Sequence, residues 1–190
     1  KNTFLPLNKN NFELSPDFSS FKVMTYNIHH GKGKMGNINL DAIASVISFS
    51  EARIVGLNEV DGYMLRSDFK KQYKILGEKL KMNYAFGPAM NKIFSKYGNA
   101  LLTTFPIKNV TNHPLPVKSG HEPRSLLEAR LELTSDEEIL VMVTHLSPEE
   151  ENRKKQIKWL EEYIEGREDA FILMGDFNSS QLKSIAGYNS

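Results

Sequence analysis

Short apolar runs bounded by turn residues recur along this chain. The runs typical of buried strands cover residues 21–28, 53–59, 138–145 and 170–174. Shorter runs at 84–87, 99–104, 107–111 and 124–133 predict further strands, and Pro106 separates two of them. The strands at 124–133 and 138–145 are expected to form an antiparallel pair joined by a turn at 134–137. The pattern therefore predicts a core built on interior strands, of which 170–174 is expected to be buried on both faces.

Helices are predicted between these strands from apolar residues spaced three and four apart. Asn39 and Ser67 are expected to cap the first two, because their side chains accept hydrogen bonds from the free backbone N–H groups of a first turn. The third is predicted to begin with a capping box from Ser147 to Glu150, with Pro148 at the first helical position. Interior strands flanked by helices indicate an α/β fold.

Composition and charge narrow the classes of protein. The chain has 190 residues, 40% of them hydrophobic, which suits one domain over 21–190 preceded by a polar N-terminal arm over 1–20. A net charge of +1 gives no general electrostatic case for nucleic acid or an anionic membrane, and no apolar run approaches the roughly 20 residues that span a bilayer. The absence of cysteine excludes disulfides and thiolate ligands. Because the chain begins at Lys1, we expect an upstream segment to have been removed, which leaves the compartment open, export included.

Polar side chains stand at the ends of the four main strands. These strands are predicted to end in Asn27, in Glu59, in His145 and in a Gly-Asp-Phe-Asn segment that carries Asp176 and Asn178. If the ends share one edge of a sheet, two carboxylates, two amides and an imidazole meet in one cleft. Oxygen ligands without thiolates suit a hard cation such as Mg²⁺ or Mn²⁺, and such a cation usually acts on phosphate esters.

Each of these residues also has a structural explanation. Asn27 can be a turn former, Glu59 a solvated strand end, and His145 a hydrogen-bonded histidine of the core. Asp176 and Asn178 can simply shape a turn, because both residue types are favoured there for local reasons. Taken one at a time, the residues leave both interpretations open.

Six short motifs follow one another between residues 21 and 179. They are Thr25-Tyr26-Asn27, Asn58-Glu59-Val60-Asp61, Tyr97-Gly98-Asn99-Ala100-Leu101-Leu102, Glu122-Pro123-Arg124, Thr144-His145-Leu146 and Gly175-Asp176-Phe177-Asn178. In order and approximate spacing this combination resembles the endonuclease/exonuclease/phosphatase superfamily, which includes deoxyribonucleases, abasic-site endonucleases and sphingomyelinases. The resemblance implies a two-sheet, four-layer α/β sandwich with the active site at one edge of the paired sheets.

The resemblance also implies roles for individual residues. Glu59 looks like the main Mg²⁺ (or Mn²⁺) ligand, with Asn27 beside it on the metal or the phosphate. Asp176 resembles the residue that orients the attacking water, Asn178 the amide that holds a phosphate oxygen, and His145 a group that acts on the transition-state phosphate or the leaving oxygen. Substrate contacts are implied for Asn99, Arg124 and Arg66, although both arginines can also be solvated charges.

Two departures from the family pattern affect what we expect. Asn58 stands where a Gln usually precedes the metal-binding Glu, and its shorter side chain puts the usual contact with the neighbouring loop in doubt. The family closes with a Ser-Asp-His motif, whereas here no histidine follows His145 and the chain ends at Ser190. We therefore expect a fold that is short at its C-terminus, with an exposed apolar patch and self-association through an incomplete sheet. The remaining histidines match no motif and are expected to be loop residues: His29, His30, His113 and His121.

Two functions fit these observations. The first is a Mg²⁺-dependent phosphoester hydrolase, of phosphodiesterase or phosphatase type, that uses in-line attack by an activated water. The second is a non-catalytic module that keeps the metal and phosphate cleft but lacks the final Asp-His pair. A small phosphodiester, a phospholipid headgroup and a nucleic acid all fit the sequence as substrates.

Overall fold

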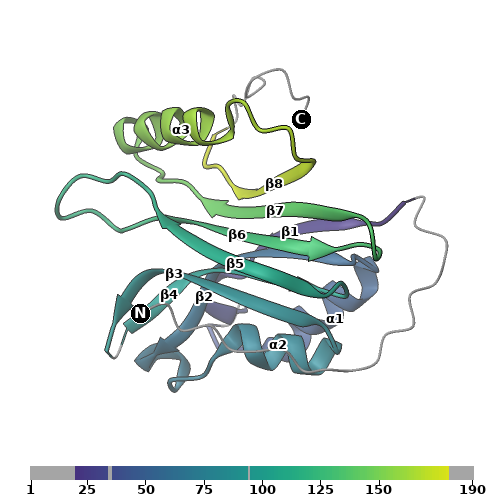
Figure 1. The fold of residues 1–190 in the computed structure, drawn as a ribbon. Helices are drawn as coiled ribbons and strands as arrows, with labels where there is room; N and C mark the ends of the chain where they lie inside the picture. Colours follow the sequence, from purple (N-terminus) through teal and green to yellow (C-terminus); the bar gives the residue numbers. More distant parts are fainter. Residues whose placement is uncertain (1–19, 34–35, 94, 180–190) are drawn as a thin grey trace.

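The computed structural model describes residues 20–33, 36–93 and 95–179, which form a layered α/β sandwich (Figure 1). The predicted N-terminal arm lies outside the described residues except for Ser20. No helix in the described ranges is long and apolar enough to cross a membrane.

Two four-stranded sheets form the middle layers of the sandwich. The first sheet has the order β1 (Val23–Asn27), β2 (Ile54–Met64), β4 (Ser95–Thr103) and β3 (Asn83–Lys92). The second has the order β5 (Ile107–Pro114), β6 (Ser125–Glu132), β7 (Glu138–His145) and β8 (Phe171–Asp176). In Figure 1, helices α1 (Leu40–Ser50) and α2 (Gln72–Leu80) lie on the outer side of the first sheet, and α3 (Glu150–Ile164) lies on that of the second.

Alternating apolar residues on the strands supply separate cores. In β2, Val55 and Leu57 pack toward α1 and α2, whereas Ile54 packs between the sheets. In β7, Val143 packs between the sheets and Met142 packs under α3. Since successive side chains of a strand point to opposite faces, a strand that is apolar throughout fits between two cores. Three such cores make four layers, which confirms the predicted α/β sandwich.

Parallel pairing brings the functional strand ends to one edge. β1 runs parallel to β2 with Asn27 opposite Asn58, and β7 runs parallel to β8 with His145 opposite Asp176. Strands β1 and β8 are the outermost strands of their sheets on this side, and they contact each other across the sandwich. The carboxyl ends of both sheets therefore meet in one place.

Some predicted strand features were wrong. Both β1 and β8 were expected to be interior, but each has a neighbour on one side only among the described strands. Val23 is 42% exposed, and in β8 only Met174 is buried, because each of these strands lies at the edge of its sheet. Strand β2 was expected to end at Glu59, but it continues to Met64 through a bulge between Leu57 and Val60. Self-association through this margin stays a prediction.

The helix starts were only partly as predicted. Asn39 caps α1, and its Oδ1 accepts from the Ala42 N–H at 2.9 Å. Ser67 does not cap α2, because it lies in the 3-10 turn η2 (Leu65–Ser67), where its hydroxyl donates to the Met64 carbonyl.

The capping box expected at the start of α3 is absent. Helix α3 begins only at Glu150, and the Ser147 hydroxyl instead accepts from the Glu149 N–H at 3.2 Å. The buried Gln156 accepts from the Ser147 N–H at 2.8 Å, so a side chain from within the helix holds this segment in place of a box. Pro148 therefore precedes the helix and is not at its first position.

Gly175 is the position where the backbone leaves least room. Its φ is +140°, and a Cβ there would lie 1.8 Å from the Thr144 carbonyl oxygen of the neighbouring strand. We predict that Gly175→Ala lowers the free energy of unfolding by roughly 2–4 kcal/mol, measured by urea denaturation. Gly166→Ala is the matched control, because Gly166 has φ +72° but open space around its Cβ position. The control is expected to lose about 1–2 kcal/mol, and equal losses in both variants would contradict the steric argument.

Candidate active site at the edge of the paired sheets

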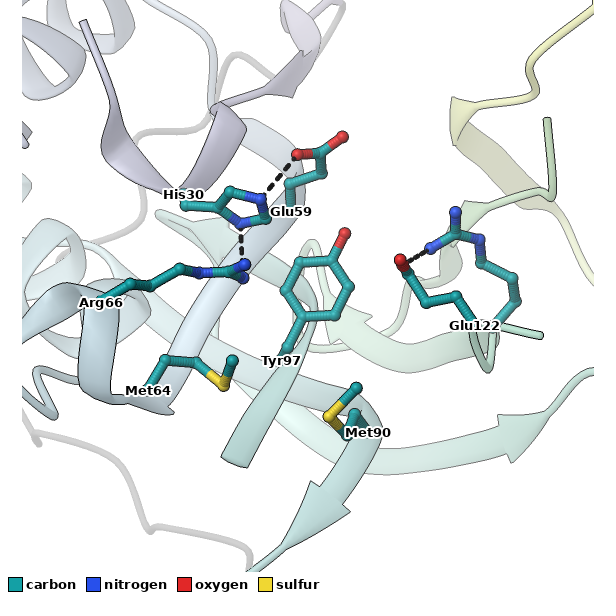
Figure 2. Close-up of a pocket in the computed structure, with 8 residues that line it drawn as sticks. His30, Glu59, Met64, Arg66, Met90, Tyr97 and Glu122 are labelled. Atoms are coloured by element: carbon teal, nitrogen blue, oxygen red, sulfur yellow. Dashed lines mark hydrogen bonds and ion pairs between the residues drawn. The ribbon is translucent and has the colours of Figure 1, made fainter. Parts of the chain in front are cut away.

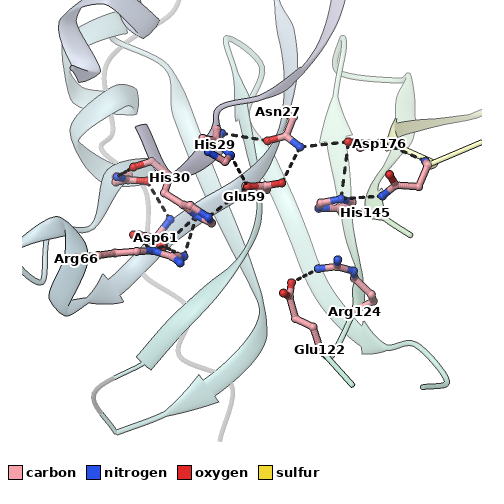
Figure 3. A network of polar contacts seen from close by, with 12 residues as sticks. Asn27, His29, His30, Glu59, Asp61, Arg66, Glu122, Arg124, His145 and Asp176 are labelled. Atoms are coloured by element: carbon pink, nitrogen blue, oxygen red, sulfur yellow. Dashed lines mark hydrogen bonds and ion pairs between the residues drawn. The ribbon is translucent and has the colours of Figure 1, made fainter. Parts of the chain in front are cut away.

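The Asn27 side chain joins two carboxylates that come from different sheets. Its Nδ2 donates to Glu59 Oε1 at 3.0 Å and to Asp176 Oδ2 at 3.1 Å (Figure 3). Its Oδ1 accepts from the His29 N–H at 3.0 Å, and this contact fixes which end of the amide is which. Because both Nδ2 hydrogens are then used, Asn27 holds the two carboxylates side by side.

Glu59 reaches this position through unusual backbone geometry. It sits at the β2 bulge with a φ of 57°, in the left-handed region that residues other than glycine enter at a cost of roughly 1–3 kcal/mol. Burial by itself would raise the pKa of its carboxyl, but the Asn27 hydrogen bond and the neighbouring His30 and His145 imidazoles lower the pKa overall. Glu59 is therefore an ionised carboxylate at neutral pH.

His145, Asp176 and Asn178 form the second half of the network. Asn178 Nδ2 donates to the Leu146 carbonyl at 2.8 Å and lies 3.1 Å from His145 Nε2, so that ring nitrogen accepts and carries no proton. His145 Nε2 also lies 3.7 Å from Asp176 Oδ2. The Asn178 N–H donates to Asp176 Oδ1 at 3.0 Å. This is the local hydrogen bond expected if Asp176 simply shapes a turn. Asp176 thus shapes a turn and faces the cleft at once.

Two histidines that were expected to be simple loop residues lie beside Glu59. His29 Nδ1 and His30 Nε2 are each 3.3 Å from Glu59 Oε2. Their segment forms a 3-10 turn, η1 (His29–Gly31), directly after β1. Their place in a loop is as expected, but sequence reasoning gave them no role because they match no motif. The signal that could have found them is two adjacent imidazoles following the strand end that carries Asn27.

Asp61 forms an ion pair with the partly exposed Arg66 beside His30. Asp61 is fully buried, and the Arg66 guanidinium donates to both of its oxygens, with the shortest contact at 2.6 Å. Burial would raise the Asp61 pKa, but the hydrogen bonds and the positive charge of Arg66 help to lower it overall. Arg66 also contacts His30 Nδ1 at 2.7 Å. Loss of Arg66 would leave the Asp61 charge buried without a partner, which is strongly destabilising. Asp61 therefore holds Arg66 in place on this side of the site, a role that sequence reasoning did not give it.

A cavity of about 170 Å³ opens next to Glu59. In Figure 2, Tyr97 lies between Arg66 on one side and Glu122 on the other. Arg124, also in the wall, is nearly buried and pairs with Glu122, and its Nε has no hydrogen-bond partner among the described residues. Burial raises the pKa of the Tyr97 hydroxyl, which stays protonated. The cavity therefore has cationic groups on two sides. Its lining residues are His30, Glu59, Met64, Arg66, Met90, Tyr97, Glu122 and Arg124.

Asn99 and Asn58 lie between the sheets and away from the cavity wall. Asn58 Nδ2 donates to Asn99 Oδ1 and to the Thr144 carbonyl, both at 2.8 Å. Asn99 Nδ2 donates to the Ser125 carbonyl at 2.9 Å and to the Val143 carbonyl at 3.4 Å. The short Asn58 side chain therefore reaches the opposite sheet. The substrate contact of Asn99 stays a prediction, and a substrate would have to displace one of these bonds.

Comparison with known proteins explains why these motifs occur together. Residues 19–188 match the family model described as the PGAP2IP, C-terminal nuclease-like domain, of the exonuclease/endonuclease/phosphatase type. The chain belongs to this family. The membership confirms the superfamily that the six motifs of this nuclease-like domain predicted.

This nuclease-like domain is similar in sequence to a bacterial protein and in fold to bacterial and human proteins. The uncharacterized protein YbhP of Escherichia coli (strain K12) is 29% identical over 178 residues, which cover 87% of this chain and 69% of YbhP. The endonuclease/exonuclease/phosphatase from Beutenbergia cavernae DSM 12333 shares the fold with a TM-score of 0.68 and 24% identity, over 83% of this chain and 47% of that chain. The human Nocturnin catalytic domain, with a bound sulfate anion, gives a TM-score of 0.62 at 22% identity, over 86% and 65% of the two chains. The chain thus spans about half the length of the Beutenbergia protein.

The protonation of His145 makes stability depend on pH. Burial and the nearby Arg124 charge lower the pKa of His145, although Asp176 and Glu59 oppose the shift. Because the unfolded chain titrates His145 near a pKa of about 6.5, it binds more protons there than the folded chain. The contribution of neutral His145 to the free energy of unfolding is therefore fully present above about pH 6.5. This contribution is lost as the pH falls through the folded-state pKa.

We predict a larger loss of unfolding free energy for the wild type than for His145→Gln between about pH 7.5 and about pH 5.5. Urea denaturation at both pH values, with a chelator present, measures the difference. Identical pH dependence in the two proteins would mean that His145 is not the titrating group.

Proposed function

We propose that this nuclease-like domain is a divalent-metal-dependent phosphoester hydrolase that uses water as the nucleophile. The observation that carries the proposal is the Asn27 bridge, which holds the ionised Glu59 beside Asp176 and His145, next to a cavity whose lining includes two arginines. Carboxylates, a neutral imidazole and guanidinium groups are the parts that phosphoester hydrolysis requires.

The donor set fits a divalent cation. Glu59 is ionised, 18% exposed and turned toward the cleft, so it would hold Mg²⁺ or Mn²⁺. Asn27 presents N–H groups to the carboxylates, so it positions Glu59, and its own contact with metal or phosphate stays a prediction. When bound, a divalent cation lowers the pKa of a coordinated water and neutralises charge on a phosphoryl oxygen.

The chain's own residues would orient the nucleophile and the phosphate. Asp176 keeps a carboxylate oxygen at the cleft because Asn27 and the Asn178 N–H hold the group from both sides. His145 Nε2 presents a lone pair, and Asp176, 3.7 Å away, would stabilise the imidazolium once His145 takes up a proton. A protonated His145 can then donate to a phosphate oxygen or to the leaving oxygen. In this arrangement the Asn178 amide donates to His145. To bind a phosphate oxygen instead, the Asn178 side chain would have to give up this hydrogen bond.

The cavity favours a compact phosphoester. Its volume of about 170 Å³ lies below the roughly 300–1,000 Å³ of pockets that enclose a drug-sized ligand. Arg124 supplies a nearly buried cation for one phosphate group, and Met64, Met90 and Tyr97 supply the less polar wall. A small phosphodiester or a phospholipid headgroup fits this space better than a long duplex, which the net charge of +1 also disfavours.

Glu59→Gln tests the metal site. The substitution removes a ligand charge but keeps an oxygen that can accept from Asn27, so we predict weaker Mg²⁺ and Mn²⁺ binding with little loss of fold stability. Titration calorimetry measures the affinity, and bis-p-nitrophenyl phosphate hydrolysis measures the activity. Glu51→Gln is the control, because Glu51 is an exposed carboxylate outside the site that pairs with Lys22. Unchanged Mg²⁺ affinity in Glu59→Gln would contradict the ligand assignment, and metal binding without turnover in the wild type would favour a non-catalytic module.

His145→Ala separates catalysis from packing. If His145 donates to phosphate or to the leaving group, its loss lowers turnover by roughly 10² or more. His113→Ala is a matched control, because His113 is a half-buried histidine outside the site that contacts Tyr163 under α3. Normal turnover with a lowered melting temperature in His145→Ala would instead identify a histidine that serves only the core.

A further inference from the structure

We propose that His29, His30 and Glu59 form a site for a borderline transition-metal dication, with Zn²⁺ as the test case. One ligand atom from each residue lies within 4.8 Å of the others. The inference deepens the proposed function and rests on it in one respect, since Glu59 is also the proposed ligand for catalysis. It adds two imidazole ligands that the family resemblance did not supply.

The distances suit a shared metal ion. Both His29 Nδ1 and His30 Nε2 lie 3.3 Å from Glu59 Oε2. Two ligands at about 2.1 Å from a zinc ion, separated by a tetrahedral angle, lie about 3.4 Å apart. Both contacts therefore have the spacing of neighbouring zinc ligands without movement of the backbone. Two histidines and one carboxylate with a further position for water is a donor set that catalytic zinc sites use.

The backbone of all three residues is strained. The φ angles of His29, His30 and Glu59 are 46°, 56° and 57°, in the left-handed region. Such conformations cost roughly 1–3 kcal/mol each and persist where the surroundings over-determine them. Elsewhere in the described chain, left-handed residues commonly follow a helix or 3-10 turn as its C-cap, where this conformation is ordinary; those caps are Glu51, Asp68 and Lys81. His29, His30 and Glu59 are not helix caps of this kind, and strained backbone of this type is often found at ligand sites.

Buried polar groups hold the histidine turn against β2. Gln72 of α2 is fully buried, and its Nε2 donates to the His30 carbonyl at 2.7 Å while its Oε1 accepts from the Asp61 N–H at 3.0 Å. Asn27 accepts from the His29 N–H on the other side. The backbone of both histidines is thus held next to β2 before any ion binds, which contributes to the preorganisation that a metal site needs.

A carboxylate stands behind His30 as metal-binding histidines usually require. Asp61 Oδ1 lies 3.6 Å from His30 Nδ1, on the ring side opposite Glu59. In the metal-free arrangement Arg66 donates to Nδ1 at 2.7 Å, so the ring proton is on Nε2. Binding through Nε2 moves this proton to Nδ1, where Asp61 accepts it while Arg66 keeps its two bonds to Asp61.

The ligand types select the class of ion. Imidazole nitrogens bind Zn²⁺ and similar ions far better than Mg²⁺, which prefers oxygen ligands and gives up its water reluctantly. The His29 side chain is 70% exposed, so the site has an open path for an ion and a bound water. The two histidines therefore favour Zn²⁺ over the Mg²⁺ that carboxylates alone would bind.

The test measures metal binding directly on the full chain. In titration calorimetry without phosphate, we expect Zn²⁺ to bind the wild type at least about 100-fold more tightly than Mg²⁺. His29→Gly removes one ligand and also relieves the left-handed backbone. This variant should therefore lose roughly 10-fold or more in Zn²⁺ affinity, keep its Mg²⁺ affinity, and show an equal or higher melting temperature without metal. His30→Gln should lose Zn²⁺ affinity as well, and Co²⁺ absorption in the visible range, a measure of coordination geometry, should change in both variants.

His121→Gln is the matched control, because His121 Nδ1 lies 2.5 Å from Glu149 Oε2 but outside the cluster. Zn²⁺ affinity that is unchanged in His29→Gly and His30→Gln, or that falls equally in His121→Gln, would overturn the inference. Phosphodiester hydrolysis is followed in parallel. Mg²⁺-dependent turnover with histidine-independent Zn²⁺ binding would remove the inference alone, whereas histidine-dependent Zn²⁺ binding without turnover under any metal would remove only the proposed function.

Discussion

Hydrogen bonds between two buried asparagines and the opposite sheet hold the sandwich in register. Asn58 and Asn99 belong to the first sheet, and their amides donate to backbone carbonyls of β6 and β7 in the second. A buried donor or acceptor left without a partner costs about 1–3 kcal/mol, so sliding of the sheets is penalised at several points at once. Apolar contacts between the sheets carry no such directional requirement. The polar pair therefore fixes the relative position of the sheets, and the apolar core supplies most of the stability.

The candidate active site depends on this register because it is shared between the sheets. Glu59 comes from β2 of the first sheet, whereas His145 and Asp176 end strands of the second. Asn27 can bridge Glu59 and Asp176 only while the two sheet edges stay within hydrogen-bond reach. A small change in sheet packing would separate the carboxylates without unfolding the protein, so the stability of the core and the geometry of the site are linked.

Charge and strain at the site are compensated by neighbouring groups. Asp61 has no access to solvent, and the Arg66 guanidinium offsets the cost of its burial. The strained turn at His29 and His30 is held by Asn27 and by the buried Gln72. The ionised and left-handed residues gathered at this site therefore lower the stability of the domain, which is typical of sites that bind or convert ligands.

The sequence by itself determined the fold class, and it pointed to several residues that the structure brings together at the candidate site. The apolar run at 138–145 predicted β7 with the bounds that the structure has, and Asn39 caps α1 as its position indicated. The polar ends at Asn27, His145 and Asp176 were also visible, because strand periodicity and local hydrogen-bonding preference act over a few residues. Hence the motifs were sufficient to identify the superfamily.

Only the tertiary structure decided how these residues meet. Asn27 and Asp176 are 149 positions apart, and their contact depends on the packing of two sheets rather than on any local preference. The bulge at Glu59 and the left-handed turn at His29 and His30 are likewise imposed by distant partners, since each is locally unfavourable. Local patterns cannot encode a conformation that they disfavour, so the histidine pair beside Glu59 became visible only when the folded chain brought it there.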